Sequence, residues 1–210
     1  MKRAFDVLAA VAGLAVLLPL FIVAGALIKA DGGPVFFRQA RVGWKGSIFY
    51  IFKFRSMVPD AEKLGSLVTA QYDPRITRVG RFLRRTKLDE LPQLLNVIKG
   101  DMSLVGPRPE VPYYVEMWPE DARREILSVR PGVTDYATLF YNDEQAVLAE
   151  TDDPERAYVK EILPHKLALY KKYVRERSFW LDFRILVATL LKMAGASPDR
   201  LVPKMRFSDS

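Results

Sequence analysis

The sequence contains no cysteine and a single histidine, His165. Without cysteine the chain has no disulfide scaffold, no thiolate zinc site and no cysteine nucleophile. One histidine argues against a histidine-rich metal centre and against a Ser/His/Asp hydrolase. Glycine-rich phosphate loops of the GxxxxGKS/T or GxGxxG kind are also missing. The chemistry that remains open therefore relies on carboxylates and hard cations.

The length and charge of the chain narrow the choice of partner. Its 210 residues, half of them hydrophobic, suffice for one ordinary domain with a buried core. A net charge of +7 indicates a polyanionic partner: nucleic acid, an anionic membrane surface or phosphate-bearing substrates. Residues 29–110 carry 15 bases and eight acids, residues 111–161 five and 12, and residues 162–210 ten and four. This alternation argues against a uniformly basic nucleic-acid-binding surface.

Residues 7–28 form an uncharged, apolar segment. Its length reaches the roughly 20 residues that a helix needs to cross a hydrocarbon core of about 30 Å. A cleaved signal peptide is the alternative, but its apolar part is usually about 7–15 residues long and ends in a small-residue cleavage site, which is lacking here. The segment is therefore predicted to lie in a membrane.

Pro19 lies near the middle of this segment and is predicted to kink it, because proline removes a helical hydrogen bond and clashes with the preceding turn. Basic residues flank the segment on both sides, at Lys2 and Arg3 and again at Lys29 and Arg38. A straight span would export one of these flanks, against the positive-inside rule. The sequence favours a re-entrant helix that leaves both flanks on the cytosolic side, with a straight span as the alternative.

The rest of the chain predicts a mainly helical α+β fold. Residues 34–54 are typical of a small β-hairpin, with aromatic and β-branched runs around a glycine-containing loop. Helices are expected near residues 111–117, 119–128, 143–150, 154–162, 164–177 and 179–193, the last two at the membrane interface. The predicted organisation is a membrane helix over residues 1–30, a cytosolic catalytic domain over 31–194 and a flexible tail over 195–210.

A basic stretch leads directly into a pair of acids. No acid interrupts residues 75–87, and arginines recur there at helical spacing: Arg75, Arg78, Arg81 and Arg85. The stretch is either a solvated helix face or a surface for anionic lipid or phosphate. Asp89 and Glu90 follow and are predicted to open a helix that has Pro92 in its first turn. Taken alone they are an ordinary exposed pair, but a helix N-terminus favours anions, and Arg108 between two prolines suits bidentate phosphate recognition.

Four motifs carry a resemblance to a known family: residues 53–57 (KFRSM), 88–97 (LDELPQLLNV), 99–109 (KGDMSLVGPRP) and 129–134 (VRPGVT). With the proline-interrupted helix, they resemble the small monotopic phosphoglycosyl transferases of the bacterial sugar transferase family, in order over residues 2–193. The resemblance implies transfer of a sugar-1-phosphate from a UDP-sugar to polyprenol (undecaprenyl) phosphate. The products would be polyprenyl diphosphate sugar and UMP, in the first membrane step of glycan assembly.

The resemblance also implies roles for individual residues. Asp89 would be the nucleophile that forms a covalent phosphosugar intermediate, and Glu90 would hold Mg²⁺, the expected cofactor. This division is chemically sound, because a carboxylate attacks phosphorus only in line and with the phosphate charge screened. Binding of substrate or phosphate is expected of Lys53, Arg55, Arg85, Arg108, Pro109, Arg130 and Asp182. Read without the resemblance, Lys53 is an exposed strand end and Asp182 a first-turn helix acid.

The expected partners are a UDP-sugar, polyprenol phosphate and membrane lipid headgroups, with no nucleic acid, and the resemblance allows a homodimer. The expected location is the cytosolic face of the bacterial inner membrane. A non-catalytic membrane adaptor, binding anionic lipid or acidic partners through residues 75–87, is the alternative function.

Two departures from the family pattern limit what carries over. Leu18 stands before Pro19, where the family often has serine, so no hydroxyl can bond a freed carbonyl there. Residues 135–144 differ from the usual continuation of the family after residue 134, so the sugar of better-known members cannot be assumed for this chain.

Overall fold

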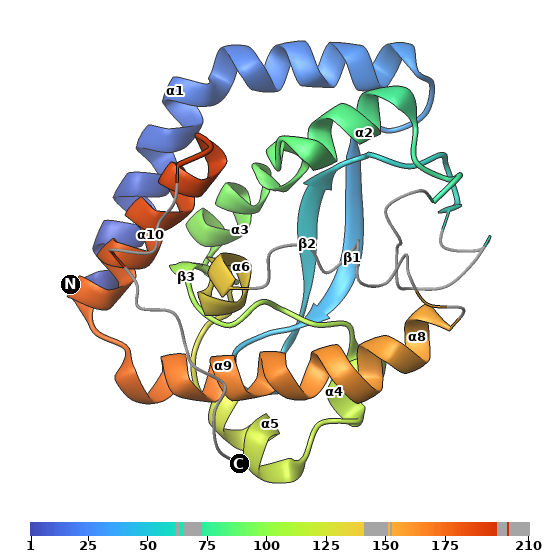
Figure 1. Cartoon of the computed structure of the whole chain (residues 1–210). Helices are drawn as coiled ribbons and strands as arrows, with labels where there is room; N and C mark the ends of the chain where they lie inside the picture. The colour runs from blue at the N-terminus through green and yellow to red at the C-terminus, as the bar shows by residue number, and fades with distance from the viewer. Residues whose placement is uncertain (62–63, 65–72, 141–150, 152, 197–200, 202–210) are drawn as a thin grey trace.

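The computed structural model describes residues 1–61, 64, 73–140, 151, 153–196 and 201 of the chain. It confirms a mainly helical α+β fold with a small hairpin. Figure 1 shows the long helix α1 (Lys2–Ala30) along two sides of the molecule and α9 (Leu163–Glu176) on the opposite side. The hairpin of β1 (Phe36–Val42) and β2 (Ile48–Phe54) stands between them. The helix expected over residues 143–150, and nearly all of the expected tail, lie outside the described residues.

Helix α1 contains Pro19 and changes direction along its length, as predicted (Figure 1). Among the described residues it is the only helix long and apolar enough to cross a membrane. Four of its side chains are buried, and most of these are small or polar: Asp6, Ala10, Ala24 and Ile28. Most of its apolar surface is therefore left outside the protein core, which suits a helix surrounded by lipid.

Both ends of α1 are fixed to the rest of the protein by hydrogen bonds from arginine side chains to backbone carbonyl groups. At its start, Arg3 donates to the carbonyl oxygens of Val97, at 2.6 Å, and Met102, at 3.1 Å. At its end, Arg55 of the segment after β2 donates to the carbonyl oxygen of Ile28 at 2.9 Å and to that of Gly32. The two halves of the helix therefore belong to one body with the remaining domain.

The hairpin and the helices after it form the frame of the site. Strands β1 and β2 pair antiparallel from Phe36 opposite Phe54 to Val42 opposite Ile48, as the sequence predicted. They are followed by α2 (Arg78–Arg85), the 3₁₀ turn η3 (Leu88–Glu90) and α3 (Gln93–Lys99). Asn96 of α3 is fully buried, accepting from the backbone N–H of Phe52 at 2.9 Å and donating to the carbonyl of Tyr50 at 2.8 Å. This side chain ties α3, and η3 before it, to β2.

A two-stranded parallel pair, β3 (Ser103–Val105) with β4 (Gly132–Thr134), was not predicted. Its three-residue strands are too short for periodicity to reveal. The pairing depends on two glycines, because a Cβ on Gly132 would lie 2.1 Å from the backbone nitrogen of Gly106. This close approach brings the turn that carries Arg108 against the segment after β4.

The remaining helices match the expected positions. They are α4 (Pro112–Glu116), α5 (Glu120–Ile126), α8 (Pro154–Ala157), the π-helical turn η4 (Tyr158–Ile162), α9, and α10 (Phe179–Met193). The N-cap of α10 is Ser178, whose hydroxyl accepts from the N–H of Leu181. The short α6 (Tyr136–Phe140) was not predicted. The largest buried cluster joins side chains of α3, β3, α4, α5, α9 and α10. This core holds the frame on which the site is built.

Candidate active site

Asp89 and Glu90 lie in η3, the short turn between α2 and α3. Lys87, just before the turn, has a φ of 58°, in the left-handed region, which separates the turn from α2; in the turn, Asp89 is buried and Glu90 is half-buried. The helix predicted to start near Asp89 is divided, because α3 begins only at Gln93. Pro92 lies between the two pieces and has no N–H to donate, which accounts for the break.

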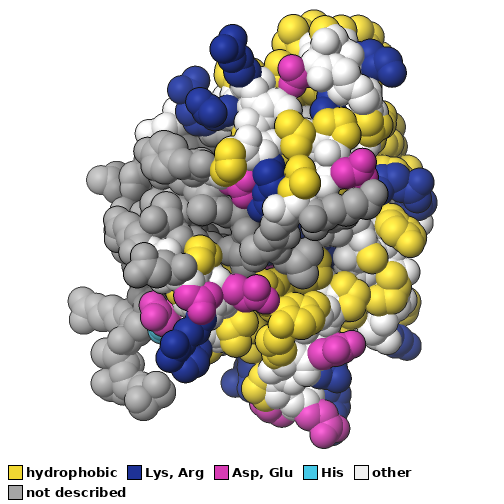
Figure 2. Space-filling view, turned by 90° about the vertical axis from the view of Figure 1, so that its right-hand side faces the viewer, with side chains coloured by type: hydrophobic (Ala, Val, Ile, Leu, Met, Phe, Trp, Pro, Cys, Tyr) yellow, Lys and Arg dark blue, Asp and Glu magenta, His cyan; other side chains and the backbone are white. Residues whose placement is uncertain are grey.

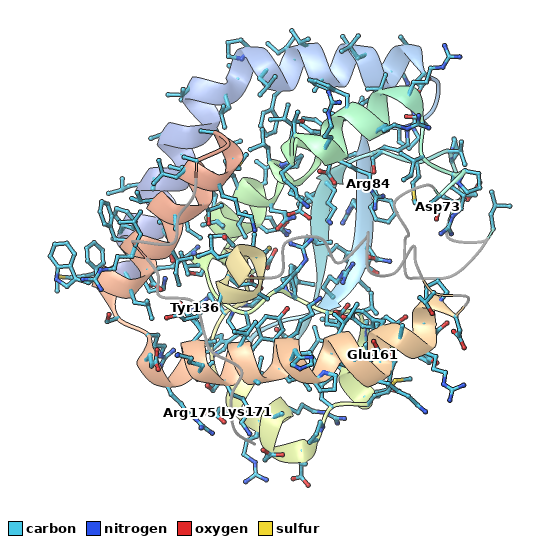
Figure 3. The ribbon with its side chains drawn as sticks, viewed as in Figure 1. Asp73, Arg84, Tyr136, Glu161, Lys171 and Arg175 are labelled. Carbon is cyan, nitrogen blue, oxygen red and sulfur yellow. The ribbon has the colours of Figure 1, made fainter. Side chains whose placement is uncertain are left out.

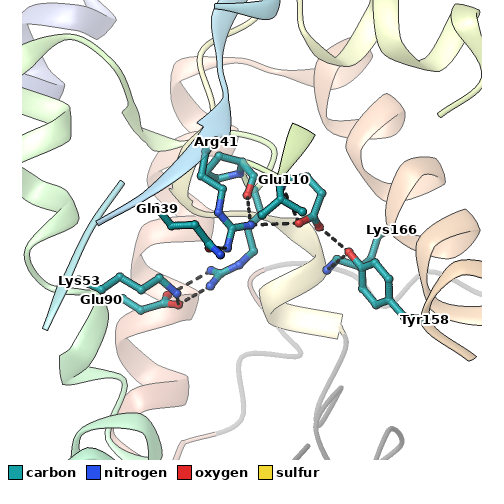
Figure 4. A network of polar contacts seen from close by, with 10 residues as sticks. Gln39, Arg41, Lys53, Glu90, Glu110, Tyr158 and Lys166 are labelled. Carbon is teal, nitrogen blue, oxygen red and sulfur yellow. Dashed lines mark hydrogen bonds and ion pairs between the residues drawn. The ribbon is translucent and has the colours of Figure 1, made fainter. Parts of the chain in front are cut away.

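Glu90 is clamped by two cations from distant parts of the sequence (Figure 4). Its Oε1 accepts from Nζ of Lys53 on β2 at 2.9 Å. Its Oε2 accepts from Nη1 of Arg108 at 3.1 Å, and Nη2 of the same guanidinium bonds Oε1. The contact with Arg108 is thus the bidentate, charge-assisted kind that gives both strength and direction.

The charges of Lys53 and Arg108 decide whether Glu90 carries a proton. Burial by itself raises the pKa of Glu90, but the charges of Arg108 and Lys53 outweigh it and hold the pKa well below the ordinary value. The charge of Glu90 in turn raises the pKa of Arg108 well above its ordinary value. Burial lowers the pKa of Lys53 more than Glu90 raises it. Glu90 is therefore a carboxylate at neutral pH, held between two donors.

Asp89 is also a carboxylic acid, but its surroundings differ from those of Glu90. It is 8% exposed, and its Oδ1 is buried without a hydrogen-bond partner among the described residues. Burial, and next the charge of Glu90, raise the pKa of Asp89, whereas Lys53 and Arg84 lower it. Figure 3 shows Arg84 on the underside of α2, toward the hairpin. Asp89 is therefore an unsatisfied carboxyl group close to several cations, the state of a group available to react or to bind.

The basic stretch before the site has two faces. Arg78, Arg81 and Arg85 are exposed on α2, so Arg85 is not brought into the cluster. Arg84, which the arginine spacing passed over, is the one whose charge acts on Asp89 and Glu90. Arg75 lies before α2 and pairs with Asp73 at 2.6 Å.

Three further candidates lie apart from the acid pair. The guanidinium of Arg55 is taken up by four carbonyl groups, those of residues 28, 32, 34 and 57, which points to an anchoring role for it. Arg130 donates to the carbonyl of Gly100 and stacks over Trp44, 4.5 Å from the ring centre. Asp182 is buried between Lys2 and the hydroxyl of Tyr173. Arg130 and Asp182 line a cavity of about 450 Å³ beside the start of α1.

Pro109 contributes through its backbone, since its carbonyl accepts from Arg41 at 3.2 Å. Arg41 and Glu110 form a second, half-buried ion pair next to Arg108, which sequence reasoning missed. Gln93 was also missed. It is 1% exposed, and neither of its amide atoms has a partner in the part of the chain that the structure describes. The signal for Gln93 was its position one turn after Asp89, whereas nothing local marked Arg41 as a partner of Glu110.

The donor set bears on a metal ion. Mg²⁺ prefers hard oxygen ligands and usually takes one or two carboxylates together with phosphate oxygens and water. Asp89 and Glu90 supply adjacent carboxylates, and the buried Oδ1 of Asp89 has no partner among the described residues. Within those same residues no group of three or more His, Cys, Asp or Glu side chains could enclose a metal. The residues therefore fit an ion that is completed by a phosphate-bearing ligand.

Fold and site together define a class of protein. A long apolar helix is joined to a domain in which two carboxylates face a set of cations, which suits phosphate chemistry next to a lipid surface. The sequence model of the family described as "Bacterial sugar transferase" matches residues 1–196, and the chain belongs to this family.

The chain is similar to several curated proteins. It is 40% identical over 196 residues to the undecaprenyl-phosphate glucose phosphotransferase of Komagataeibacter xylinus, a match covering 90% of this chain and 35% of that protein. It is 51% identical over 116 residues to a putative undecaprenyl-phosphate N-acetylgalactosaminyl 1-phosphate transferase of Bacillus subtilis, covering 55% and 65%. With the exopolysaccharide production protein PSS of Rhizobium leguminosarum bv. phaseoli it shares 38% identity, covering 91% and 94%. The first of these relatives is thus nearly three times as long as the part that this chain matches.

Proposed function

We propose that the protein transfers a sugar-1-phosphate from a UDP-sugar to polyprenol (undecaprenyl) phosphate, yielding polyprenyl diphosphate sugar and UMP. The observation that carries the proposal is the pair Asp89 and Glu90. The carboxylate of Glu90 is clamped by Lys53 and Arg108, whereas Oδ1 of Asp89 is buried and has no hydrogen-bond partner among the described residues. Membership of the family and the activities for which its relatives are named support the proposal. The reaction would be the first membrane step in the assembly of a glycan.

Asp89 is the nucleophile in this proposal. Its carboxylate oxygen attacks the phosphorus that carries the sugar, a new oxygen–phosphorus bond forms, and the bond to the bridging oxygen of the diphosphate breaks. UMP leaves with that oxygen. A phosphate oxygen of polyprenol phosphate then attacks the same phosphorus and releases the Asp89 carboxylate, so charge and atoms balance over the two steps.

The cations around the pair serve this chemistry. Lys53, Arg84 and Arg108 bring positive charge to a site where phosphate oxygens must be held and their charge screened. Lys53 and Arg108 also fix the Glu90 carboxylate in one orientation. Glu90 would hold Mg²⁺, and the ion would add further screening of the negative charge on the diphosphate.

The same proposal makes α1 a re-entrant helix in the inner membrane, with the catalytic domain on the cytosolic face. Its support is that both ends of α1 bond the same domain, through Arg3 and through Arg55. A straight span would place one end across the bilayer, where that domain could not reach it. Figure 2 shows Lys and Arg side chains beside hydrophobic ones at the upper end of the molecule, which suits lipid headgroups above an apolar interior.

The test of the reaction is UMP release from a panel of UDP-sugars with undecaprenyl phosphate. We expect turnover with one or a few donors, dependence on Mg²⁺, and a labelled protein adduct from UDP-sugar alone. Asp89→Asn should abolish both turnover and adduct. The matched control is Asp121→Asn, since that carboxylate is largely exposed and pairs with Lys171 at 2.7 Å, in α9. Full turnover by Asp89→Asn would refute the assigned role, and vesicle binding without turnover of any donor would favour a membrane adaptor.

Topology is tested separately. Because the chain has no cysteine, a single one introduced at Ala4 or at Asp31 reports its own side of the membrane. Both positions are exposed and lie at opposite ends of α1. We expect a membrane-impermeant maleimide to label both from the cytosolic side only. Labelling of the two variants from opposite sides would establish a straight span.

A further inference from the structure

A chain of polar side chains, buried at Tyr158 and Lys166 and half-buried at Arg41 and Glu110, leads from α9 to the turn that carries Arg108. Glu110 stands two residues after Arg108, and its Oε1 accepts from Nη1 of Arg41 at 3.0 Å and from the N–H of Val111 at 2.9 Å. Its Oε2 accepts from the hydroxyl of Tyr158, which lies in η4. Figure 4 shows these contacts in one row beside the clamp on Glu90.

Arg41 fixes the backbone of the same turn. Its Nη1 also donates to the carbonyl oxygen of Pro109 at 3.2 Å, while Nη2 donates to Oε1 of Gln39 at 2.5 Å. The N–H of Val42 donates to the carbonyl of Glu110 at 2.9 Å. The two residues that follow Arg108 are therefore held to β1 by one side chain and one backbone bond.

Lys166 closes the chain from the side of α9. It is 4% exposed, its Nζ lies 3.4 Å from the hydroxyl of Tyr158, and it also sits over that ring, 5.1 Å from its centre. The hydroxyl of Tyr158 thus contacts both the half-buried carboxylate of Glu110 and the buried ammonium of Lys166. It lies in a π-helical turn, a rare geometry that often occurs where a side chain is directed to a functional site.

The energetics favour an orienting role for this network. The side chains of Arg41 and Glu110 are only 17% and 12% exposed, so they lose most of their hydration, and an ion pair in such a place adds little net stability compared with apolar side chains of similar size. What such a pair supplies is geometry, since every bond fixes both distance and direction. Here the geometry is imposed on the turn from which Arg108 reaches Glu90.

We propose that Glu110, Arg41 and Tyr158 are positioning residues for Arg108, which hold the turn of residues 107–110 so that its guanidinium meets Glu90. Among the described residues no hydrogen bond or ion pair joins any of the three to Asp89 or Glu90, so the proposal places their effect on the turn of Arg108. The kinetic part of this inference rests on the proposed function. Its structural part does not.

The structural test is hydrogen exchange of the peptide that spans residues 105–112, compared between the wild type and Tyr158→Phe. This substitution keeps the ring and removes only the hydroxyl. We expect exchange of that peptide to become at least severalfold faster, because Glu110 loses one of its donors and the turn loosens. The control is Glu125→Gln, which breaks a surface ion pair with Arg175 and should leave the peptide unchanged. Equal exchange in wild type and Tyr158→Phe would overturn the proposal, whether or not any UDP-sugar is turned over.

The kinetic test is a double-mutant cycle between Tyr158→Phe and Arg108→Lys. Tyr158→Phe should lower kcat/KM about tenfold, which is the usual effect of losing one hydrogen bond to a charged group. In the Arg108→Lys background the same change should have almost no effect, because the guanidinium that it positions is gone. A full tenfold loss in both backgrounds would overturn the positioning role, since it would show that Tyr158 acts independently of Arg108. A wild type without turnover would refute the proposed function and leave the exchange result to decide this inference.

Discussion

The two adjacent carboxylates should respond in opposite ways to loss of charge. Glu90 is held by Lys53 and Arg108, with side-chain exposures of 18%, 19% and 32%. Removing one partner of a buried ion pair costs roughly 3–5 kcal/mol, because the other charges stay buried and unpaired. We take the lower end, about 3 kcal/mol, since Arg108 is partly exposed. For a chain of this size this is a fall in melting temperature of about 6–12 °C for Glu90→Gln.

Asp89→Asn should show no such loss. The carboxyl group is buried, its Oδ1 has no partner among the described residues, and burial raises its pKa. A neutral amide in place of this poorly solvated carboxylate removes the free-energy cost of burying a charge. The melting temperature should therefore stay level or rise by up to about 3 °C. An enzyme that keeps an unsatisfied carboxylate for reaction would be more stable without it.

The assay is thermal unfolding followed by tryptophan fluorescence, with all variants in the same lipid nanodiscs and without added ligand. The pH dependence provides a second check. Because the pKa of Glu90 is depressed in the folded state, its contribution is fully present above its ordinary pKa of 4.5 and is lost as pH falls from there toward the folded value. The gap between wild type and Glu90→Gln should therefore stay constant from about pH 8 to 6 and shrink below about pH 4.5. The reasoning fails if Glu90→Gln melts level with the wild type, or if Asp89→Asn is the less stable of the two variants.

Three further outcomes follow from the contacts. Arg55→Met should lower the free energy of unfolding by roughly 3 kcal/mol and expose the end of α1 to proteolysis, because four carbonyl groups lose their hydrogen-bond donor. Protease resistance equal to that of the wild type would count against the anchoring role. Gly80→Ala should yield little folded protein, because the new Cβ would lie 1.9 Å from the carbonyl oxygen of Ser56. Gly13→Ala leaves 3.5 Å to the nearest side-chain atom, so this variant should fold and its free energy of unfolding should rise by about 0.5–1 kcal/mol. Solubility and circular dichroism of the two variants test this difference. Because the pKa of Asp89 is raised from its ordinary 3.8 and Arg84 lowers it, Arg84→Gln should move the acidic limb of the kcat/KM profile to higher pH, and an unmoved limb would show that Asp89 is not the titrating group.

Much of the fold could be predicted from local patterns. The apolar helix with Pro19, the hairpin and the positions of α4, α5, α9 and α10 all follow from composition, periodicity and capping residues, which act over one or two turns. The pair β3–β4 could not be predicted, because three-residue strands have no period and depend on the contact between Gly106 and Gly132. Local rules also placed η3 and α3 in one helix, whereas Pro92 divides them.

The candidate site was predicted in part. The pair Asp89 and Glu90, with Lys53 and Arg108 around it, agrees with the family motifs, and the structure brings these four together. The arginines of the site were harder to predict, because the spacing of residues does not reveal which face of a helix points toward the protein. The stripe through Arg85 lies on the exposed face of α2, and Arg84, one residue earlier, acts on Asp89.

The sequence by itself determined that an uncharged helix precedes a domain with a carboxylate pair, because hydropathy and adjacency are properties of neighbouring residues. Only the tertiary structure decided how each charge is used. Lys53 and Arg108 meet Glu90 across separations of 37 and 18 residues, and Arg41 meets Glu110 across 69. Two identical side chains therefore have different roles. The guanidinium of Arg108 binds the carboxylate of Glu90, whereas the guanidinium of Arg55 donates to backbone carbonyl groups. The physical reason is that ion pairing and burial depend on distance in space, which the folded chain alone establishes.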